Sequence, residues 1–249
     1  MSTVAPGAVT GRIHSWDLST GVDGPGTRFV LFVNGCPLRC LYCANPDTWH
    51  MRDGKKATVD EVAAEIGKYR DFVAAAGGGV TVTGGEPLLQ PAFTAAVLRR
   101  CKEAGLHTAL DTSGFLGARA SDALLADTDL VLLDIKSFDV TTYRKLTGGA
   151  LAPTLDFATR LDRMGKRMWI RYVLVPGWTD GDDAVDGLAG FLSGLESVER
   201  VDILPFHKLG AAKYDTLEIP FPLRDTPVPD RTLVERVRDR FRRRGLVAH

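Results

Sequence analysis

Short apolar runs alternate with amphipathic stretches along most of the chain. The runs are rich in β-branched and aliphatic residues, as strands covered on both faces are, and the stretches between them repeat apolar residues at helical spacing. This alternation is typical of parallel strands joined by helices. It predicts six strands, over residues 28–33, 80–83, 107–111, 130–135, 168–174 and 201–204.

Helix boundary signals accompany the amphipathic stretches. Thr58 and Glu61 form an S/T-x-x-E capping box ahead of apolar residues at helical spacing. Pro91 stands at a favoured first position of the next helix, and Gly105 follows its end. The predicted helices cover residues 58–76, 91–104, 121–126, 154–164, 183–195 and 230–244.

The number of strands and the length of the chain limit the fold. Six strand–helix units are too few for a closed eight-stranded barrel, which leaves a partial barrel or a doubly wound sheet. The proline-rich run 220–229 is typical of an extended connector before the last helix. Because 249 residues are a common length for one α/β domain, we expect residues 1–249 to form a single domain.

Composition excludes several classes of protein. The 31 basic and 31 acidic residues balance at a pI near 7.0, so nucleic-acid binding driven by net charge is not expected. With 45% hydrophobic and 25% charged residues, the chain is too apolar for disorder. We find no secretory signal and no apolar run long enough for a membrane helix, and we expect a cytoplasmic protein with no membrane partner.

The last predicted helix is rich in arginine, which raises the question of a phosphate or RNA surface. Leu233, Val237 and Phe241 recur at helical spacing and predict one buried stripe. Arginines on the remaining face are most simply solvated, so we assign this helix no binding role.

Three of the four cysteines form a compact motif. Cys36, Cys40 and Cys43 have the spacing C-x3-C-x2-C directly after the first predicted strand, whereas Cys101 stands alone in a predicted helix. Such clustering favours a metal or cluster site in a reducing compartment over a disulfide framework. A closed zinc site needs a fourth ligand that the sequence does not supply nearby, whereas three thiolates on a four-iron cluster leave one iron open. An incomplete zinc knuckle or a chance group of buried thiols is the alternative.

The cysteine motif resembles that of the radical S-adenosylmethionine (SAM) superfamily, whose fold is a partial or full (β/α) barrel. More narrowly, an ordered set of motifs is similar to the pyruvate formate-lyase-activating enzyme family of glycyl-radical-enzyme activases, from Gly11 to about the last helix. The resemblance implies an α/β fold, a partial (β/α)6 barrel with parallel strands and outer helices, and a cluster loop at residues 34–45. The further motifs are DGPGTR at 23–28, YCANPDTW at 42–49, GGEP at 84–87, DTSGF at 111–115, DIK at 134–136 and WIRYVLVPG at 169–177.

The resemblance also implies an activity in anaerobic glucose metabolism. A [4Fe-4S] cluster on Cys36, Cys40 and Cys43 would bind SAM and cleave it reductively, and the resulting radical would remove a Cα hydrogen from a glycine loop of pyruvate formate-lyase. Flavodoxin or ferredoxin would supply the electron, and we expect a monomer. The stretch 44–83 lacks the cysteines of the ferredoxin-like insert found in several other activases, which favours the pyruvate formate-lyase subtype.

The motif residues fall at the carboxyl ends of predicted strands, the edge where α/β folds bind ligands. The resemblance assigns Arg171 and Asp23 to catalysis, together with the three cluster cysteines. A monovalent cation, Na⁺ or K⁺, is assigned to Asp111, Thr112 and Asp134. Cofactor binding is assigned to Tyr42, Cys43, Ala44, Asn45, Gly84, Gly85, Glu86, Asp134, Ile135, Lys136, Arg171 and His207.

Several of these assignments have a plainer structural interpretation. Gly84 and Gly85 are compatible with a simple turn, Lys136 with a surface lysine, and Asp111 with a helix cap. Ala44 stands where the family usually has histidine, so a side-chain contact is lost there while a backbone contact to adenine survives.

Two other functions stay open from the sequence. One is a radical SAM reaction on a small molecule, such as the ring-forming step of deazapurine synthesis, which also combines a GPG-x-R segment with a short barrel. The other is an iron–sulfur or zinc protein without catalytic activity. Iron and sulfide content together with SAM cleavage would separate the enzyme from the binding protein.

Overall fold

The computed structural model describes residues 6–249, which divide into two compact units. The first unit comprises the described residues up to Pro37 together with Thr48–Thr112 and Ala118–Leu132, and the second comprises Leu38–Asp47, Ser113–Gly117 and Leu133–His249. The cysteine loop is therefore shared, with Cys36 in the first unit and the other two loop cysteines in the second. That residues 1–249 form a single domain stays a prediction. No helix in the described part is long and apolar enough to cross a membrane.

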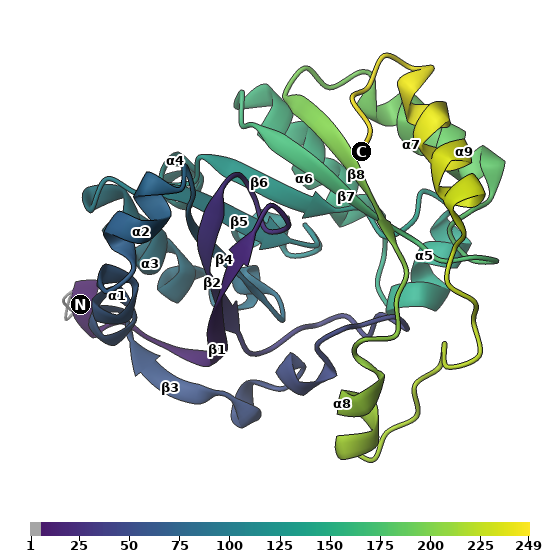
Figure 1. The fold of residues 1–249 in the computed structure, drawn as a ribbon. Coiled ribbons are helices and arrows are strands. Elements are labelled where there is room, and N and C mark those ends of the chain that lie inside the picture. Colours follow the sequence, from purple (N-terminus) through teal and green to yellow (C-terminus); the bar gives the residue numbers. More distant parts are fainter. Residues whose placement is uncertain (1–5) are drawn as a thin grey trace. The chain divides into compact units, whose positions relative to one another are not determined.

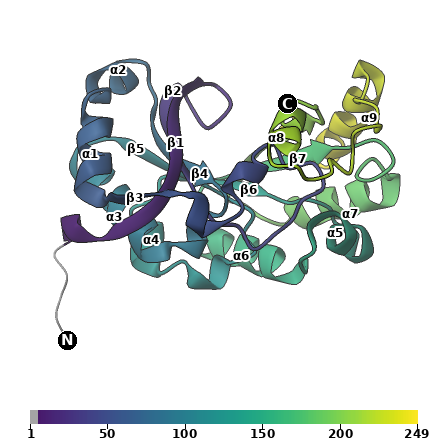
Figure 2. The ribbon, with the colours of Figure 1, turned by 90° about the horizontal axis from the view of Figure 1, so that it is seen from below.

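Six strands build the sheet of the first unit: β1 (Thr10–Thr20), β2 (Thr27–Val33), β3 (Lys55–Thr58), β4 (Gly79–Gly84), β5 (His107–Thr112) and the beginning of β6 (Leu130–Asp134). Their order is β3-β1-β2-β4-β5-β6. β2, β4 and β5 are parallel, whereas β1 runs antiparallel to both of its neighbours, β2 and β3. Figure 2 shows the long β1 strand beside β2.

Four helices accompany these strands: α1 (Val59–Gly67), α2 (Arg70–Ala75), α3 (Pro91–Glu103) and α4 (Asp122–Ala126). Figure 1 shows α1, α2 and α3 as blue helices on one side of the unit. They bury apolar side chains such as Ile66, Val73 and Leu98, and each such side chain stabilises the fold by about 1.5–3 kcal/mol. β2 and β4 are themselves buried along most of their length, as parallel strands under helices must be.

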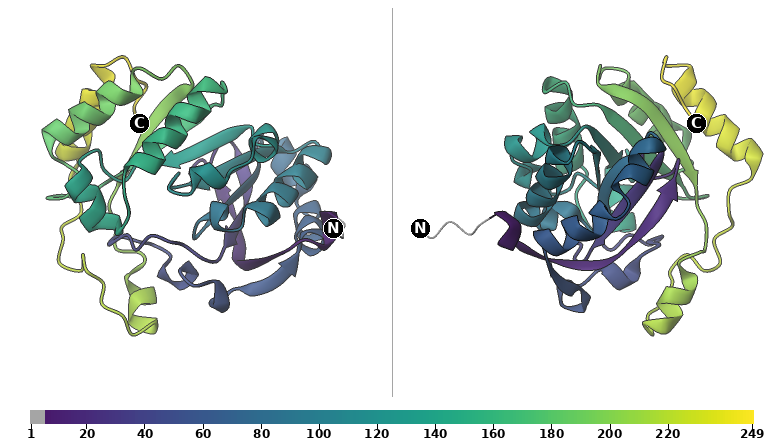
Figure 3. Two further views of the ribbon diagram at one scale, coloured as in Figure 1. Left: turned by 180° about the vertical axis from the view of Figure 1, so that it is seen from behind. Right: turned by 60° about the vertical axis from the view of Figure 1, so that its left-hand side comes forward.

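The second unit contains the end of β6 and two further parallel strands, β7 (Met168–Leu174) and β8 (Val198–Pro205). Figure 3 shows α7 and α9 side by side, and the core beneath α9 includes an edge-to-face contact between Tyr172 and Phe241, 6.2 Å between ring centroids. The helices of the second unit are α5 (Val140–Thr147), α6 (Ala152–Arg163), α7 (Asp182–Leu192), α8 (Ala211–Thr216) and α9 (Arg231–Arg242). Short 3-10 turns in the chain cover Pro6–Ala8, Pro46–Thr48, Met51–Asp53, Pro87–Leu89 and Gly117–Arg119.

The six strands expected from the sequence are confirmed as β2, β4, β5, β6, β7 and β8. The strand order begins at β3 and ends at β8, and these two edge strands do not pair with each other, so the sheet is open. The expected α/β class with mostly parallel strands, matching a partial barrel, is thereby confirmed. β1 and β3 escape the sequence pattern because they are largely exposed and polar, and so lack the apolar runs that identify buried strands.

The expected helices differ from the observed ones in three places. The capping box of Thr58 and Glu61 is confirmed, but the helix expected over 58–76 breaks after Gly67, a poor helix former, into α1 and α2. The sequence interpretation missed α5, although Asp139 caps its beginning and Gly148 ends it in the left-handed conformation, with φ of 76°. It also missed the short α8.

The buried stripe of the last helix differs from the prediction at one of its three residues. Val234, Val237 and Phe241 are buried, whereas Leu233 is only half-buried. Several arginines of this helix pair with carboxylates: Arg240 reaches Asp182 and Asp186 on α7, and others pair within the helix. These pairs agree with the interpretation of α9 as a structural helix.

Candidate active site

Predicted site residues of the first unit lie where β4 and β5 end. Gly84 is the last residue of β4, Glu86 follows it, and Asp111 and Thr112 close β5. The two strands are parallel, with Val82 opposite Leu110, so their carboxyl ends form one edge. The structure therefore brings these four polar or glycine positions together, as the sequence predicts.

Their side chains bind one another. The buried Glu86 carboxylate accepts hydrogen bonds from the Thr112 hydroxyl at 2.6 Å and from the Leu88 backbone amide at 3.1 Å. Asp111 accepts one from the Thr83 hydroxyl at 2.6 Å. The Thr112 hydroxyl thus acts as a donor toward Glu86.

The two glycines are needed for close packing of backbone against backbone. A Cβ atom on Gly84 would lie 2.4 Å from the Val33 backbone nitrogen, and one on Gly85 would lie 2.4 Å from the carbonyl oxygen of Gly35. Gly84 also has a positive φ of 113°, which other residues rarely adopt. The motif thus has a structural reason of its own, whatever ligand approaches the turn.

The first part of the cysteine loop packs on this turn. The Glu86 amide donates to the Gly35 carbonyl at 2.8 Å, and the Gly35 amide donates to the Thr48 carbonyl at 2.6 Å. The Cys36 amide donates to the Trp49 carbonyl at 3.0 Å. These backbone bonds position Cys36 beside the end of β4.

The second part of the loop is held by the end of α5. The amides of Arg39 and Leu41 donate to the carbonyls of Thr147 and Leu146, at 2.8 and 2.9 Å. The last carbonyls of a helix lack partners within the helix, so the loop satisfies them and is itself fixed. The Cys43 amide then donates to the Cys40 carbonyl at 3.0 Å, which places both cysteines on one turn.

Burial raises the pKa of the Cys40 thiol to about 12, although the positive charge of Lys136 works in the opposite direction. In the metal-free chain this thiol therefore carries its proton at neutral pH. Iron binds the thiolate, so loading of the loop must release that proton.

Lys136, Asp134 and Arg171 form a charged group at the end of β6 and the middle of β7. Lys136 Nζ lies 2.7 Å from Asp134 Oδ2, and Arg171 Nε lies 3.9 Å from Asp134 Oδ1. Burial alone would lower the pKa of Lys136, but the charge of Asp134 and its neighbours outweighs burial and raises the pKa well above its usual value. The lysine is thus a buried, charged residue rather than a surface one, with 12% of its side chain exposed.

Tyr42 lies beside this charged group. Lys136 Nζ is 5.9 Å from the centre of its ring, within range of a cation–π interaction. Burial raises the pKa of the Tyr42 hydroxyl well above its usual value. Among residues 6–249 the hydroxyl finds no hydrogen-bond partner, which is unusual for a buried polar atom and suits a polar ligand.

Two other predicted residues of the second unit lie near strand ends. Ile135 is fully buried, and its amide donates to the Arg171 carbonyl at 3.1 Å, so only its backbone is polar here. His207 follows the end of β8 and is exposed, and its Nδ1 accepts from the Leu209 amide at 3.3 Å.

Asp23 and the rest of the 23–28 motif lie at the other end of the strands. Arg28 pairs with Gly79 at the start of β2 and β4, whereas the turn after Gly84 follows their ends. The Asp23 carbonyl accepts from the Thr81 hydroxyl at 2.7 Å. The structure therefore does not bring Asp23 to the edge where Glu86 lies.

Arg28, the last residue of this motif, is fully buried. Its guanidinium donates to the Thr81 hydroxyl at 2.6 Å and to the carbonyls of Pro25, Val80 and His107. Burial lowers its pKa to about 10, still far above neutrality, so the charge persists and is balanced by these acceptors.

Sequence reasoning missed three residues that contact the end of the cysteine loop. Lys213 Nζ donates to Asn45 Oδ1 at 2.8 Å and lies 3.0 Å from Asp47 Oδ2. The buried Tyr214 lies near Cys43, and Gly210 packs on Ala44. No motif identifies them, because α8 is short and far from the loop in the sequence.

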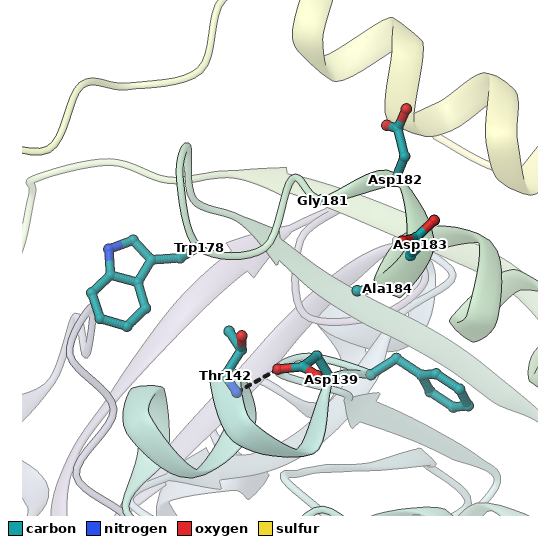
Figure 4. A pocket seen from close by; sticks show the side chains of 8 residues that line it. Asp139, Thr142, Trp178, Gly181, Asp182, Asp183 and Ala184 are labelled. Carbon is teal, nitrogen blue, oxygen red and sulfur yellow. Dashed lines mark hydrogen bonds between the residues drawn. The ribbon is translucent and has the colours of Figure 1, made fainter.

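A cavity of about 470 Å³ lies between the starts of α5 and α7. Figure 4 shows Trp178 beside Thr142 and Asp139, whose carboxylate accepts from the Thr142 amide at 2.7 Å. Asp182 and Asp183 border the same space. None of the predicted site residues lines it.

Comparisons with known proteins agree with the motifs. The profile of the Radical SAM superfamily matches residues 30–188. Pyruvate formate-lyase 1-activating enzyme of Escherichia coli (strain K12) is 43% identical over 233 residues, covering 93% of this chain and 95% of the relative. The pyruvate formate-lyase-activating enzyme of Clostridium pasteurianum is 44% identical over 223 residues, with 90% and 93% covered. The crystal structure of a domain of the Bacteroides vulgatus enzyme of that name matches with a TM-score of 0.59 at 26% identity, covering 69% of this chain and 98% of that domain.

The chain belongs to the pyruvate formate-lyase-activating enzyme family of the radical SAM superfamily. It is a radical SAM activase, and a [4Fe-4S] cluster and SAM are its cofactors. The sequence similarity to these activases thus extends over nearly the whole chain and is not limited to the cysteine motif.

The loop residues fit the cluster of a radical SAM activase. Cys36, Cys40 and Cys43 are half-buried thiols, and the last two share one turn. Within residues 6–249, no three His, Cys, Asp or Glu side chains are already gathered as metal ligands. A preformed set is not required, since metal binding commonly completes the folding of its own site. The buried Tyr42 hydroxyl offers a polar contact beside Cys43.

Proposed function

We propose that the chain activates pyruvate formate-lyase by removing one hydrogen atom from the Cα of a glycine in a loop of that enzyme. The observation that carries the proposal is the likeness to activases with this name at 43–45% identity over about nine-tenths of the chain. Nothing in the described site favours a small-molecule reaction or a purely binding role.

When bound, the cluster and SAM supply the electron and the 5′-deoxyadenosyl radical. The hydrogen leaves the glycine as an atom, 5′-deoxyadenosine is released, and the unpaired electron stays on the glycine Cα. In this proposal Cys36, Cys40 and Cys43 hold the cluster, and their burial limits the access of water.

The charged group of the second unit is proposed to bind the polar parts of SAM. Lys136 is suited to the carboxylate of the methionine moiety, and Asp134 to the ribose hydroxyls or to a cation, because both are buried and charged. Tyr42, the backbone of Ala44, Asn45, Ile135 and His207 complete the proposed binding set with the Gly84, Gly85 and Glu86 turn.

A monovalent cation, Na⁺ or K⁺, is proposed at Asp111, Thr112 and Asp134. Carboxylate and hydroxyl oxygens are the ligands that hard cations prefer. Support comes from the position of Asp111 and Thr112, which are the last two residues of β5.

Arg171 is proposed to position the substrate loop, since it lies half-buried in the middle of β7, 3.9 Å from the Asp134 carboxylate. Asp23 stays a weaker candidate, because it lies at the opposite end of β2 and β4. We further propose a flavodoxin or ferredoxin as electron donor, a monomeric enzyme and a cytoplasmic location.

The test is activation of the partner. Inactive pyruvate formate-lyase is incubated anaerobically with the reconstituted enzyme, a reductant and SAM, and its turnover of pyruvate is then measured. We expect activity that requires all three components. A partner that stays inactive while a pterin-like small molecule is converted would favour the deazapurine reaction instead.

A further inference from the structure

The segment after β8 returns to the end of the cysteine loop. Figure 1 shows the chain leaving β8, forming α8 and continuing as an extended connector to α9. All of its contacts with residues 43–47 lie inside the second unit. They are made by Gly210, Lys213 and Tyr214, none of which belongs to a motif of the sequence analysis.

The first contact is a close approach of backbones. A Cβ atom on Gly210 would lie 2.9 Å from Ala44 Cα and 3.0 Å from the Ala44 carbonyl oxygen. The residue at the start of α8 therefore touches the residue directly after Cys43. Only a side chain as small as glycine allows this approach without a shift of the loop.

The second contact fixes the helix to the loop. Tyr214 is 1% exposed, and its ring packs on Phe221 at 4.8 Å between centroids. Burial and the nearby Cys43 and Cys40 raise the pKa of its hydroxyl, and a hydrogen bond with the Cys43 backbone works in the opposite direction. A buried aromatic side chain with several neighbours holds α8 in one position.

The third contact is polar. The Lys213 ammonium donates to Asn45 Oδ1 at 2.8 Å and to Asp47 Oδ1 at 3.1 Å, and so bridges two acceptors on alternate residues of the loop. With 38% of the lysine and 24% of the aspartate side chain exposed, the pair is partly shielded from water. Such a charge-assisted bridge between a fixed helix and a loop limits the positions that the loop can adopt.

We infer that Lys213 is a positioning residue for the cluster loop, which holds Asn45 and Asp47 so that Cys43 and the backbone of Ala44 stay in place for the cluster and SAM. This inference rests on the proposed function only in assuming that the loop holds a cluster. It gives α8 a task that neither the motifs nor the comparisons assign.

The test compares three variants of the anaerobically reconstituted full chain. Lys213→Met keeps the length of the side chain and removes its charge, and Lys213→Arg restores a charged donor. Lys208→Met is the matched control, because this exposed lysine lies in the same segment but donates to the Arg224 carbonyl instead of the loop. Two quantities are measured: the rate of iron loss to a chelator, and hydrogen exchange of the loop amides in the iron-free protein.

We expect Lys213→Met to lose iron about tenfold faster, the lower end of what loss of an outer-shell contact costs a metal site. Exchange should rise at residues 43–47 and not in β7, and Lys213→Arg should restore both values. If Lys213→Met matches Lys208→Met in both measurements, the inference is wrong. A protein that melts at a lower temperature with faster exchange throughout would also overturn it, since the role would then be general stability. Neither measurement involves pyruvate formate-lyase, so failure of the proposed function would be seen separately.

Discussion

The Thr112 hydroxyl donates a 2.6 Å hydrogen bond to the carboxylate of Glu86, and so links the end of β5 to the turn that follows β4. Glu86 is 1% exposed, and its carboxylate also accepts a hydrogen bond from the Leu88 amide. The glutamate of the GGE motif therefore serves the turn itself. It holds the backbone that the proposal assigns to SAM.

Replacement of Thr112 tests this link. Thr112→Val removes the donor from a buried carboxylate, and we expect the free energy of unfolding to fall by about 1–3 kcal/mol. Thr112→Ser keeps the hydroxyl and should recover most of the loss. Urea unfolding of the metal-free protein provides the measurement. Equal stability of the valine and serine variants would show that the bond does not support the turn.

The cysteines give the second prediction. Alanine at Cys36, Cys40 or Cys43 should abolish cluster binding and SAM cleavage, because each removes one of three thiolate ligands. Cys101→Ala should keep both, since Cys101 is buried in α3 of the first unit. Iron and sulfide content and the yield of 5′-deoxyadenosine are measured. Loss of iron from Cys101→Ala as complete as from Cys36→Ala would contradict the three-ligand assignment.

The third prediction concerns the buried charges. Asp134→Ala leaves the Lys136 ammonium buried without its 2.7 Å partner, and removal of one member of a buried pair costs about 3–5 kcal/mol. We expect a loss of stability of that order together with weaker SAM binding. The double variant with Lys136→Met should recover most of this stability, because the buried ammonium is removed together with its partner, but not SAM affinity. Recovery of both would remove Lys136 from the SAM site.

The pH dependence of stability gives the fourth. Burial raises the pKa of the Cys101 thiol from 9.0 to about 12, against the opposing charge of Arg28. Below the unfolded pKa the thiol is protonated in both states and contributes its full stabilisation. Between the two pKa values the unfolded chain releases the proton and the folded chain keeps it, so the free energy of unfolding falls as pH rises, by up to about 1.4 kcal/mol for each pH unit.

Cys101→Ala should therefore show a shallower decline in stability between about pH 8 and 10.5 than the unaltered chain. Guanidinium unfolding at several pH values supplies the comparison. Parallel curves for the two proteins would mean that the thiol titrates alike in both states.

The sequence predicts the parts of the fold that depend on buried, local patterns. β7 follows its expected bounds because its residues are mostly buried, whereas the exposed β1 carries no such signal. The edge with Glu86 and Thr112 was predictable because parallel strands end together. The position of Asp23 was not, because a motif next to a strand does not say at which end of the sheet its side chain acts.

Contacts between segments that are distant in the sequence could not be predicted either. The bond of Lys213 to Asn45 joins residues 168 positions apart, and neither residue has a local pattern that points to the other. The same holds for Arg28, whose acceptors on Val80 and His107 lie on β4 and β5. A charged residue inside a predicted strand signals only that a partner exists somewhere in the fold.

Hydrogen-atom transfer from a glycine of pyruvate formate-lyase is tested most directly with a partner deuterated at its glycine Cα. After anaerobic reaction with the reduced enzyme and SAM, electron paramagnetic resonance and the mass of 5′-deoxyadenosine are recorded together. We predict a glycyl radical whose doublet, seen with unlabelled partner, collapses on deuteration, and one deuterium in each 5′-deoxyadenosine formed by the coupled reaction. SAM cleavage that leaves the partner without a radical and 5′-deoxyadenosine without deuterium would contradict the proposed function.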